Sequence, residues 1–286
     1  MHLHFPPIPC TVTIYNIRVR HNIEFNIITK NGKQTPYFKT AHLNVRSLRH
    51  KLDEVRLLLQ NLNIDILCVS ETRLDQTICD SHVARHGYQI TRCDHTYNGY
   101  GGVAIYVRDT ITFQVRHDIN TSEELEMMWI EIPARPNKDV LIACIYRPPS
   151  APASYYNHIV DTLERASSFD KFMIVGDTNY NYEFNEDLYH NPIFMLENMF
   201  MLKQLILSPT RVTMTSSSLL DIILSSNPDE HTESGVYKIM LSDHYLIYTC
   251  IKTHVKKNKH KEIRFRDYSK FDICSCIDAF KNGFTS

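Results

Sequence analysis

The chain has 286 residues, of which 43% are hydrophobic and 22% charged, a balance that supports a sizeable folded core. Its formal net charge of −1 excludes the strongly basic composition of proteins that wrap nucleic acid over their whole surface. No apolar run approaches the ~20 residues of a membrane span, and the first ten residues, MHLHFPPIPC, lack the basic and apolar regions of a secretory signal. The eight cysteines form no C-x-x-C pair. We therefore expect a soluble, intracellular protein that is not secreted and has no membrane partner.

Residues 1–36 contain two stretches with partly alternating β-branched residues, TVTIYNIRVR and IEFNIITKNGK. The second ends in NGK, which is typical of a turn. We expect an N-terminal extension here that is either hairpin-like or without regular structure.

A regular pattern begins at Tyr37. YFKTAHLN predicts a strand that ends at Asn44, and RSLRHKLDEVRLLLQNLN predicts an amphipathic helix with Ser47 as its N-cap. IDILCVSET predicts a buried strand that ends at Glu71. Strand, helix and strand in this order are typical of layered α/β domains.

The same alternation continues to Ile251, so we place one α/β domain at residues 37–251. Further strands are expected at GGVAIYVRD, MMWIEIP, VLIACIYRPPS, KFMIVGDTNYN, SSLLDIILSS and SDHYLIYTCI, and further helices at YYNHIVDTLERASS and NPIFMLENMFMLKQLIL. Residues 252–286 begin with KTHVKKNKHKEIRFRDYSK, a basic stretch without periodicity. This tail is either a solvated linker or a contact for a phosphate backbone.

Polar residues lie at or near the ends of the apolar strands, or within one of them in the case of Asp221. The set is Asn44, Glu71, Tyr146, Asp177, Asn179, Asp221, Asp243 and His244. Each alone is more often a cap or turn residue than a catalyst. Strand ends gather along one edge of a layered α/β fold, where sites form, so together they indicate a functional site.

The residue types suggest phosphodiester hydrolysis. Glu71 and Asp243 are oxygen ligands of the kind that Mg²⁺ prefers. His244 could act as a general base if a carboxylate such as that of Asp221 orients its ring. Asn44, Asn179 and Tyr146 could donate hydrogen bonds to a phosphate oxygen.

A serine hydrolase built on Ser242, Asp243 and His244 is excluded by geometry. Neighbouring residues of a strand point to opposite faces, so Asp243 cannot support His244 there. The chain also lacks the G-x-S-x-G motif of such enzymes.

A set of motifs in fixed order carries a resemblance: HLNVRSLRHKLDEVRLLL, DILCVSETRLD, GYGGVAIYVRD, IYRPPS, MIVGDTNYN, PTRVT, SSLLDIILSS and SGVYKIMLSDHYLIY. The chain resembles the endonuclease domain of non-LTR (LINE-type, jockey-like) retrotransposons, within the endonuclease/exonuclease/phosphatase superfamily. The resemblance runs from about Tyr37 to Ile251. It implies a DNase I-like four-layer α-β-β-α sandwich, in which two β-sheets pack face to face and the helices lie outside.

The resemblance also implies a role for each site residue. Metal binding falls to Glu71, with Asn44 beside it, and to Asp243. Phosphate contact falls to Tyr146 and Asn179, with Arg147 as a further substrate contact. Asp177 would position or activate water, and Asp221 would orient His244. One departure is Thr178 in GDTN, where the family usually has an aromatic residue, so we expect looser packing beneath this loop.

The activity implied is a Mg²⁺-dependent (or Mn²⁺-dependent) nick in DNA that leaves a 3′-hydroxyl, without a small-molecule cofactor. A nuclear location follows from the DNA substrate only. The reverse transcriptase domain of such elements is absent from the sequence, so we interpret the chain as a fragment, a degenerate copy or an endonuclease domain retained by a host. Two alternatives stay open: a phosphatase of the same superfamily, and a remnant without activity.

Overall fold

The computed structural model describes residues 37–94, 100–135, 139–182, 188–252 and 254–255. All of them belong to the unit that begins at Pro36. The expectations for residues 1–36 and 256–286 lie outside the described residues. None of the helices described here is long and apolar enough to cross a membrane.

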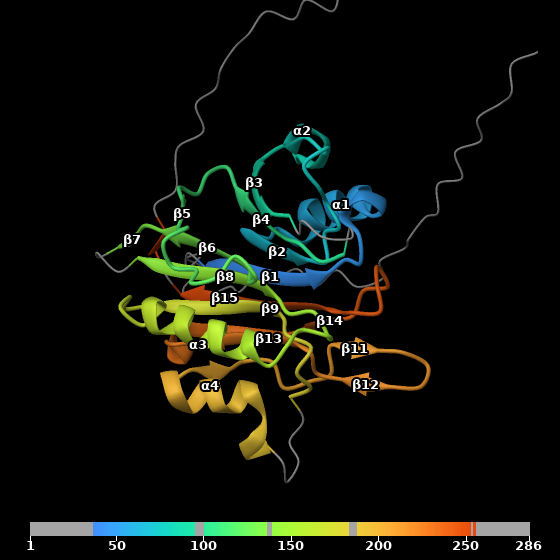
Figure 1. The fold of residues 1–286 in the computed structure, drawn as a ribbon. Helices are drawn as coiled ribbons and strands as arrows, with labels where there is room; N and C mark the ends of the chain where they lie inside the picture. Colours follow the sequence, from blue (N-terminus) through green and yellow to red (C-terminus); the bar gives the residue numbers. More distant parts are fainter. Residues whose placement is uncertain (1–36, 95–99, 136–138, 183–187, 253, 256–286) are drawn as a thin grey trace, which may run out of the picture. The chain divides into compact units, whose positions relative to one another are not determined.

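Two six-stranded sheets form the centre of this unit (Figure 1). The first contains, in spatial order, β14 (His231–Tyr237), β15 (Leu246–Lys252), β1 (Tyr37–Asn44), β2 (Ile66–Ser70), β4 (Val103–Arg108) and β3 (Tyr88–Cys93). The second contains β10 (Lys203–Gln204), β13 (Asp221–Ser225), β9 (Phe172–Asp177), β8 (Val140–Tyr146), β6 (Glu126–Ile132) and β5 (Gln114–Val115). Each sheet has one parallel pair, β1 with β2 and β8 with β9, so both sheets are mixed.

Two short ribbons flank the sheets. One joins β11 (Arg211–Val212) to β12 (Ser217–Ser218), and the other joins β7 (Ala134–Arg135) to β16 (His254–Val255). Regular pairing therefore extends beyond Ile251, where the sequence pattern placed the end of the domain.

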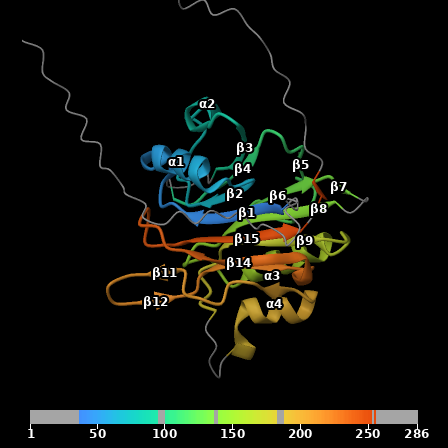
Figure 2. The same cartoon turned by 180° about the vertical axis from the view of Figure 1, so that it is seen from behind.

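Helices cover the outer faces of both sheets (Figures 1 and 2). The long helices are α1 (Leu52–Leu62) over the first sheet and α3 (Ser154–Ala166) and α4 (Pro192–Phe200) over the second. The short ones are η1 (Leu48–His50), α2 (Asp80–Val83), η2 (Leu188–His190) and η3 (Pro228–Glu230). One apolar cluster fills the space between the sheets, and two more lie beneath the helices. The predicted four-layer α-β-β-α sandwich is thus confirmed.

Two local predictions were wrong. Ser47 does not cap α1, which begins at Leu52; Ser47 has a φ of 99° and no capping hydrogen bond from its side chain. The reason is tertiary, because the Ser47 N–H donates to the carbonyl of Glu71 at 2.7 Å. The helix expected through residue 207 ends at Phe200, where Met201 takes a left-handed conformation and β10 follows.

Gly176 in β9 tests how closely the two parallel strands of the second sheet approach. A Cβ atom at this position would overlap the backbone carbonyl oxygen of Ile145 in β8. We expect Gly176→Ala to lower the free energy of unfolding by about 1–3 kcal/mol, since backbone must move to accept the methyl group. Urea denaturation measures the change. Gly235→Ala is the control, because its Cβ would meet only Tyr248 at an ordinary 3.4 Å. An equal loss of unfolding free energy in the two variants would contradict the close approach of β8 to Gly176.

Candidate active site

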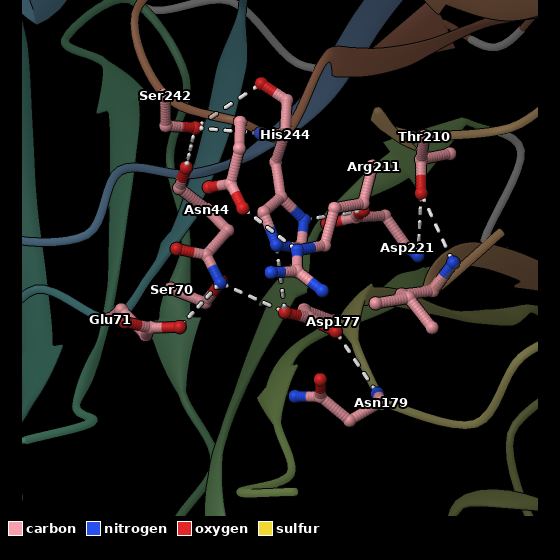
Figure 3. A network of polar contacts seen from close by, with 12 residues as sticks. Asn44, Ser70, Glu71, Asp177, Asn179, Thr210, Arg211, Asp221, Ser242 and His244 are labelled. Carbon is pink, nitrogen blue, oxygen red and sulfur yellow. Dashed lines mark hydrogen bonds and ion pairs between the residues drawn. The ribbon is translucent and has the colours of Figure 1, made fainter. Parts of the chain in front are cut away.

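Strand register brings the predicted site residues to one edge of the sandwich. In the second sheet, Asp177 is the register partner of both Tyr146 and Asp221, so the three lie in one row. In the first sheet, Asn44 at the end of β1 is the partner of Ser70, and Glu71 follows directly. Figure 3 shows the side chains of Asn44, Asp177, Asp221 and His244 pointing toward one another.

Asn44 connects the two sheets. Its fully buried side chain donates from Nδ2 to Glu71 Oε1 at 2.9 Å and to Asp177 Oδ2 at 2.8 Å (Figure 3). An amide nitrogen carries two hydrogens, so both bonds can be made at once. Asn44 therefore holds an acid of the first sheet and an acid of the second sheet close together.

His244 is paired with Asp221. Its Nδ1 lies 2.8 Å from Asp221 Oδ2, and its Nε2 lies 3.9 Å from Asp177 Oδ2. The adjacent acid, Asp243, points elsewhere and binds Arg46 Nε at 2.9 Å and Arg211 Nε at 2.8 Å. The structure thus places Asp221, and not the sequence neighbour Asp243, behind the imidazole.

Burial and charge set the protonation of this group. Burial disfavours a charged imidazole and is the largest effect on His244, but the negative charge of Asp221 and of its neighbours outweighs it and raises the pKa of His244 to about 9. Burial, with repulsion from Asp221, raises the pKa of Asp177 to about 7. Near neutral pH, His244 is therefore charged and can donate a proton, while Asp177 can accept one.

Asp177, Asp221 and His244 form a group that could hold a metal ion, with one ligand atom of each within 4.8 Å of the others. Within this group, Nδ1 of His244 is hydrogen-bonded to Asp221 and its Nε2 faces Asp177. The carboxylate of Glu71 is a further oxygen donor of the kind that Mg²⁺ prefers. Its side chain is partly accessible and binds Arg73 at 3.0 Å, and the loop holds Glu71 at a φ of 50°.

Tyr146 and Asn179, which were also predicted, lie next to Asp177. Tyr146 is buried, and burial together with the charges of Glu71, Asp177 and Glu126 raises the pKa of its hydroxyl. Asn179 has a φ of 51° and donates from its side chain to the Arg147 carbonyl at 2.8 Å.

The structure does not bring the Arg147 guanidinium to the open side of the site. It is buried, stacks on the Tyr180 ring at 4.1 Å and donates to the carbonyls of Pro148 and Ala151. In this arrangement Arg147 orders its own loop. Thr178 is buried too, and its hydroxyl donates to the Leu220 carbonyl at 3.3 Å, a bond that an aromatic residue could not make.

Sequence reasoning missed three residues that belong to this network. Thr210 accepts from the N–H groups of Leu220 and Asp221, His42 lies 3.4 Å from Asp221, and the buried Glu126 accepts from the Gly102 N–H at 2.5 Å. Alternation along β1 could have found His42, because residues 42 and 44 share a face. An acid that opens the apolar strand MMWIEI was a signal for Glu126. Nothing local identifies Thr210.

Comparisons with known proteins identify the family and the fold. The model of the Endonuclease/Exonuclease/phosphatase family matches residues 41–244. A search of curated protein sequences found no match.

Among solved structures, the catalytic domain of APE2 from Xenopus laevis is 18% identical, with a TM-score of 0.61 over 78% of this chain and 94% of that one. The endonuclease domain of TRAS1, a telomere-specific non-LTR retrotransposon, is 16% identical, with a TM-score of 0.60 over 76% and 98%. The 3′ phosphatase NExo from Neisseria, bound to a product DNA hairpin, is 15% identical, with a TM-score of 0.56 over 74% and 98%. Likeness at these identities shows that the fold is shared.

The charge of Asp221 predicts how His244 titrates. In Asp221→Asn the imidazole stays buried but loses its main counter-charge, so we expect its pKa to fall well below about 9. NMR titration of the His244 ring measures it. Asp243→Asn is the control and should have a smaller effect, because Asp243 contributes least among the three acids that raise this pKa. A larger shift in the Asp243 variant would contradict the pairing.

The same pairing predicts how stability depends on pH. The folded-state pKa of His244 lies above the ordinary value of 6.5. Its contribution to the free energy of unfolding should therefore be complete below pH 6.5 and be lost as the pH rises through about 9. Urea denaturation at a series of pH values measures this loss. If the free energy of unfolding changed with pH equally in wild type and in His244→Ala over this range, the result would count against the contribution of His244.

Proposed function

The chain belongs to the Endonuclease/Exonuclease/phosphatase family, and we propose that it is a Mg²⁺-dependent DNA endonuclease of the non-LTR retrotransposon type. It would nick DNA by phosphodiester hydrolysis and leave a 3′-hydroxyl. The observation that carries the proposal is the buried network in which Asn44 joins Glu71 to Asp177, next to the Asp221–His244 pair. The likeness to the TRAS1 endonuclease supports the retrotransposon type. A nuclear location belongs to the same proposal, since it follows from the substrate.

Each residue has a task in this reaction. Asp177 takes the proton of the attacking water, for which a pKa raised to about 7 suits it. His244, held as a cation by Asp221, donates a hydrogen bond from Nε2 to the phosphate as charge develops there. The bond between phosphorus and the 3′ oxygen breaks, and the leaving 3′ oxygen takes a proton from solvent to become the 3′-hydroxyl. The buried Tyr146 hydroxyl and the Asn179 amide face the same phosphate. Glu71 would hold Mg²⁺, which supplies a Lewis acid when bound.

Arginines at the rim support a nucleic acid as the substrate. Arg46, Arg73 and Arg211 each pair with a site carboxylate, and their side chains remain about a third exposed or more. Guanidinium groups bind phosphate in two-point contacts. A polyanion bound along this rim could replace the carboxylates as the partner of these arginines. This favours a DNA strand over a small phosphorylated molecule as the substrate.

Plasmid nicking tests the proposal. We expect wild-type protein to convert supercoiled plasmid to open circles in Mg²⁺ and not in EDTA. His244→Ala and Glu71→Ala should each lower the rate about 10²–10⁴-fold, since each removes a charged group from the reacting centre. Gel densitometry gives the rate, and circular dichroism checks the fold.

Exposed residues of the same types provide the controls, His190→Ala and Glu54→Ala, which should nick at the wild-type rate. Nicking that persists in His244→Ala would overturn the mechanism. A folded wild-type protein that releases phosphate from small esters and leaves plasmid intact would instead identify a phosphatase. Activity on neither substrate would identify an inert remnant.

A further inference from the structure

A second histidine lies on the far side of Asp221. His42 in β1 is fully buried, and its Nδ1 lies 3.4 Å from Asp221 Oδ1, while Asp221 Oδ2 faces His244. The other ring nitrogen of His42, Nε2, lies 3.0 Å from the Ser70 hydroxyl. Asp221 is therefore bracketed by two imidazoles, one on each carboxylate oxygen.

The facing atoms of His42 and Asp221 have no other hydrogen-bond partner among the described residues. Both His42 Nδ1 and Asp221 Oδ1 are buried, and neither makes a hydrogen bond of normal length. A buried polar atom left without a partner destabilises the folded state. Each atom is thus the natural partner of the other, and a small movement of the ring from 3.4 Å completes the bond.

The ring chemistry of His42 fits this pairing. Burial is the main influence on His42 and lowers its pKa to about 4, so the ring is neutral and has one donor and one acceptor. The Ser70 hydroxyl can donate to Nε2, which leaves the hydrogen on Nδ1, directed at Asp221.

The strand geometry gives His42 a parallel with Asn44. Both lie on one face of β1, two residues apart, and both reach across to the second sheet. Asn44 contacts Asp177 and His42 contacts Asp221, and these two acids are register partners in adjacent strands. Residues of one strand in the first sheet therefore contact two neighbouring acids of the second sheet.

We propose that His42 is a positioning residue that fixes the Asp221 carboxylate and, through it, the ring of His244. With His244 bonded to one oxygen and the His42 ring 3.4 Å from the other, rotation of the carboxylate away from His244 Nδ1 is restricted. His42 is buried behind Asp221, so it acts on the chemical step and not on the binding of DNA. This inference rests on the proposed nuclease function, because it assigns a role within that site.

The first test separates kcat from KM in the nicking reaction. His42→Leu removes the hydrogen bond of the ring to Ser70 and its polar contact with Asp221, and we expect kcat to fall about 10–100-fold with an unchanged KM, as for other residues that orient a catalytic ligand. His42→Gln retains an N–H that can reach Asp221 and should restore a large part of kcat. His42→Leu with the wild-type kcat, or a fall that glutamine does not relieve, would overturn the proposal.

The control is His231→Leu. His231 is a half-buried histidine held between two hydroxyls, those of Ser225 at 2.8 Å and Thr249 at 2.7 Å, but it lies away from the site. This variant should lose stability to a similar extent and keep the wild-type kcat. A fall in kcat equal to that of His42→Leu would mean that His42 has only a structural role.

A second readout does not depend on activity. In metal-free protein without DNA, the proton between His244 Nδ1 and Asp221 should give a far-downfield NMR resonance. We expect this resonance to broaden or move upfield in His42→Leu, to recover in His42→Gln and to be unchanged in His231→Leu. An identical resonance in wild type and His42→Leu would overturn the role of His42. Failure of the wild type to nick DNA would count against the proposed function alone, since this experiment needs no turnover.

Discussion

The hydrogen bonds of Asn44 are the constraint on which the site depends. One amide nitrogen holds Glu71 of the first sheet and Asp177 of the second, so the two sheets must stay in fixed register at this edge. The apolar cluster between the sheets provides that register, and the loops beyond the strands complete it. The backbone N–H of Ser47 contributes by donating to the Glu71 carbonyl, which ties the loop after β1 to the loop after β2.

Burial shifts the pKa values in this group of acids, and it also disfavours their charged forms. Asp177 and Asp221 are buried side by side, and their repulsion is relieved by Asn44, by His244 and, in our account, by His42. The result is a carboxyl group and an imidazole whose pKa values are both raised, that of Asp177 to about 7 and that of His244 to about 9. Displaced pKa values of this kind are typical of sites that move protons at neutral pH.

Strand ends and alternation are local signals, and they predicted a layered α/β domain and most members of the site. The four layers were expected from the family resemblance. YFKTAHLN and MIVGDTN each ended in a polar residue where the structure has a strand end at the site. The contacts that cross between sheets could not be predicted in this way. The arginine partners of Asp243 and the part played by Thr210 depend on how distant loops meet. The buried position of Arg147 depends on how its own loop folds. β3 and β14 were missed as well, since their residues are only partly buried and alternate weakly.

The chemistry of the nick tests the central claim most directly, namely that this network hydrolyses a phosphodiester in DNA and leaves a 3′-hydroxyl. Supercoiled plasmid would be treated with the protein in Mg²⁺, and the product offered to a DNA polymerase with a labelled nucleotide. The account predicts labelled open circles without prior phosphatase treatment. Open circles that accept label only after their 3′ ends have been dephosphorylated would contradict it, as would plasmid that remains supercoiled in the presence of folded protein.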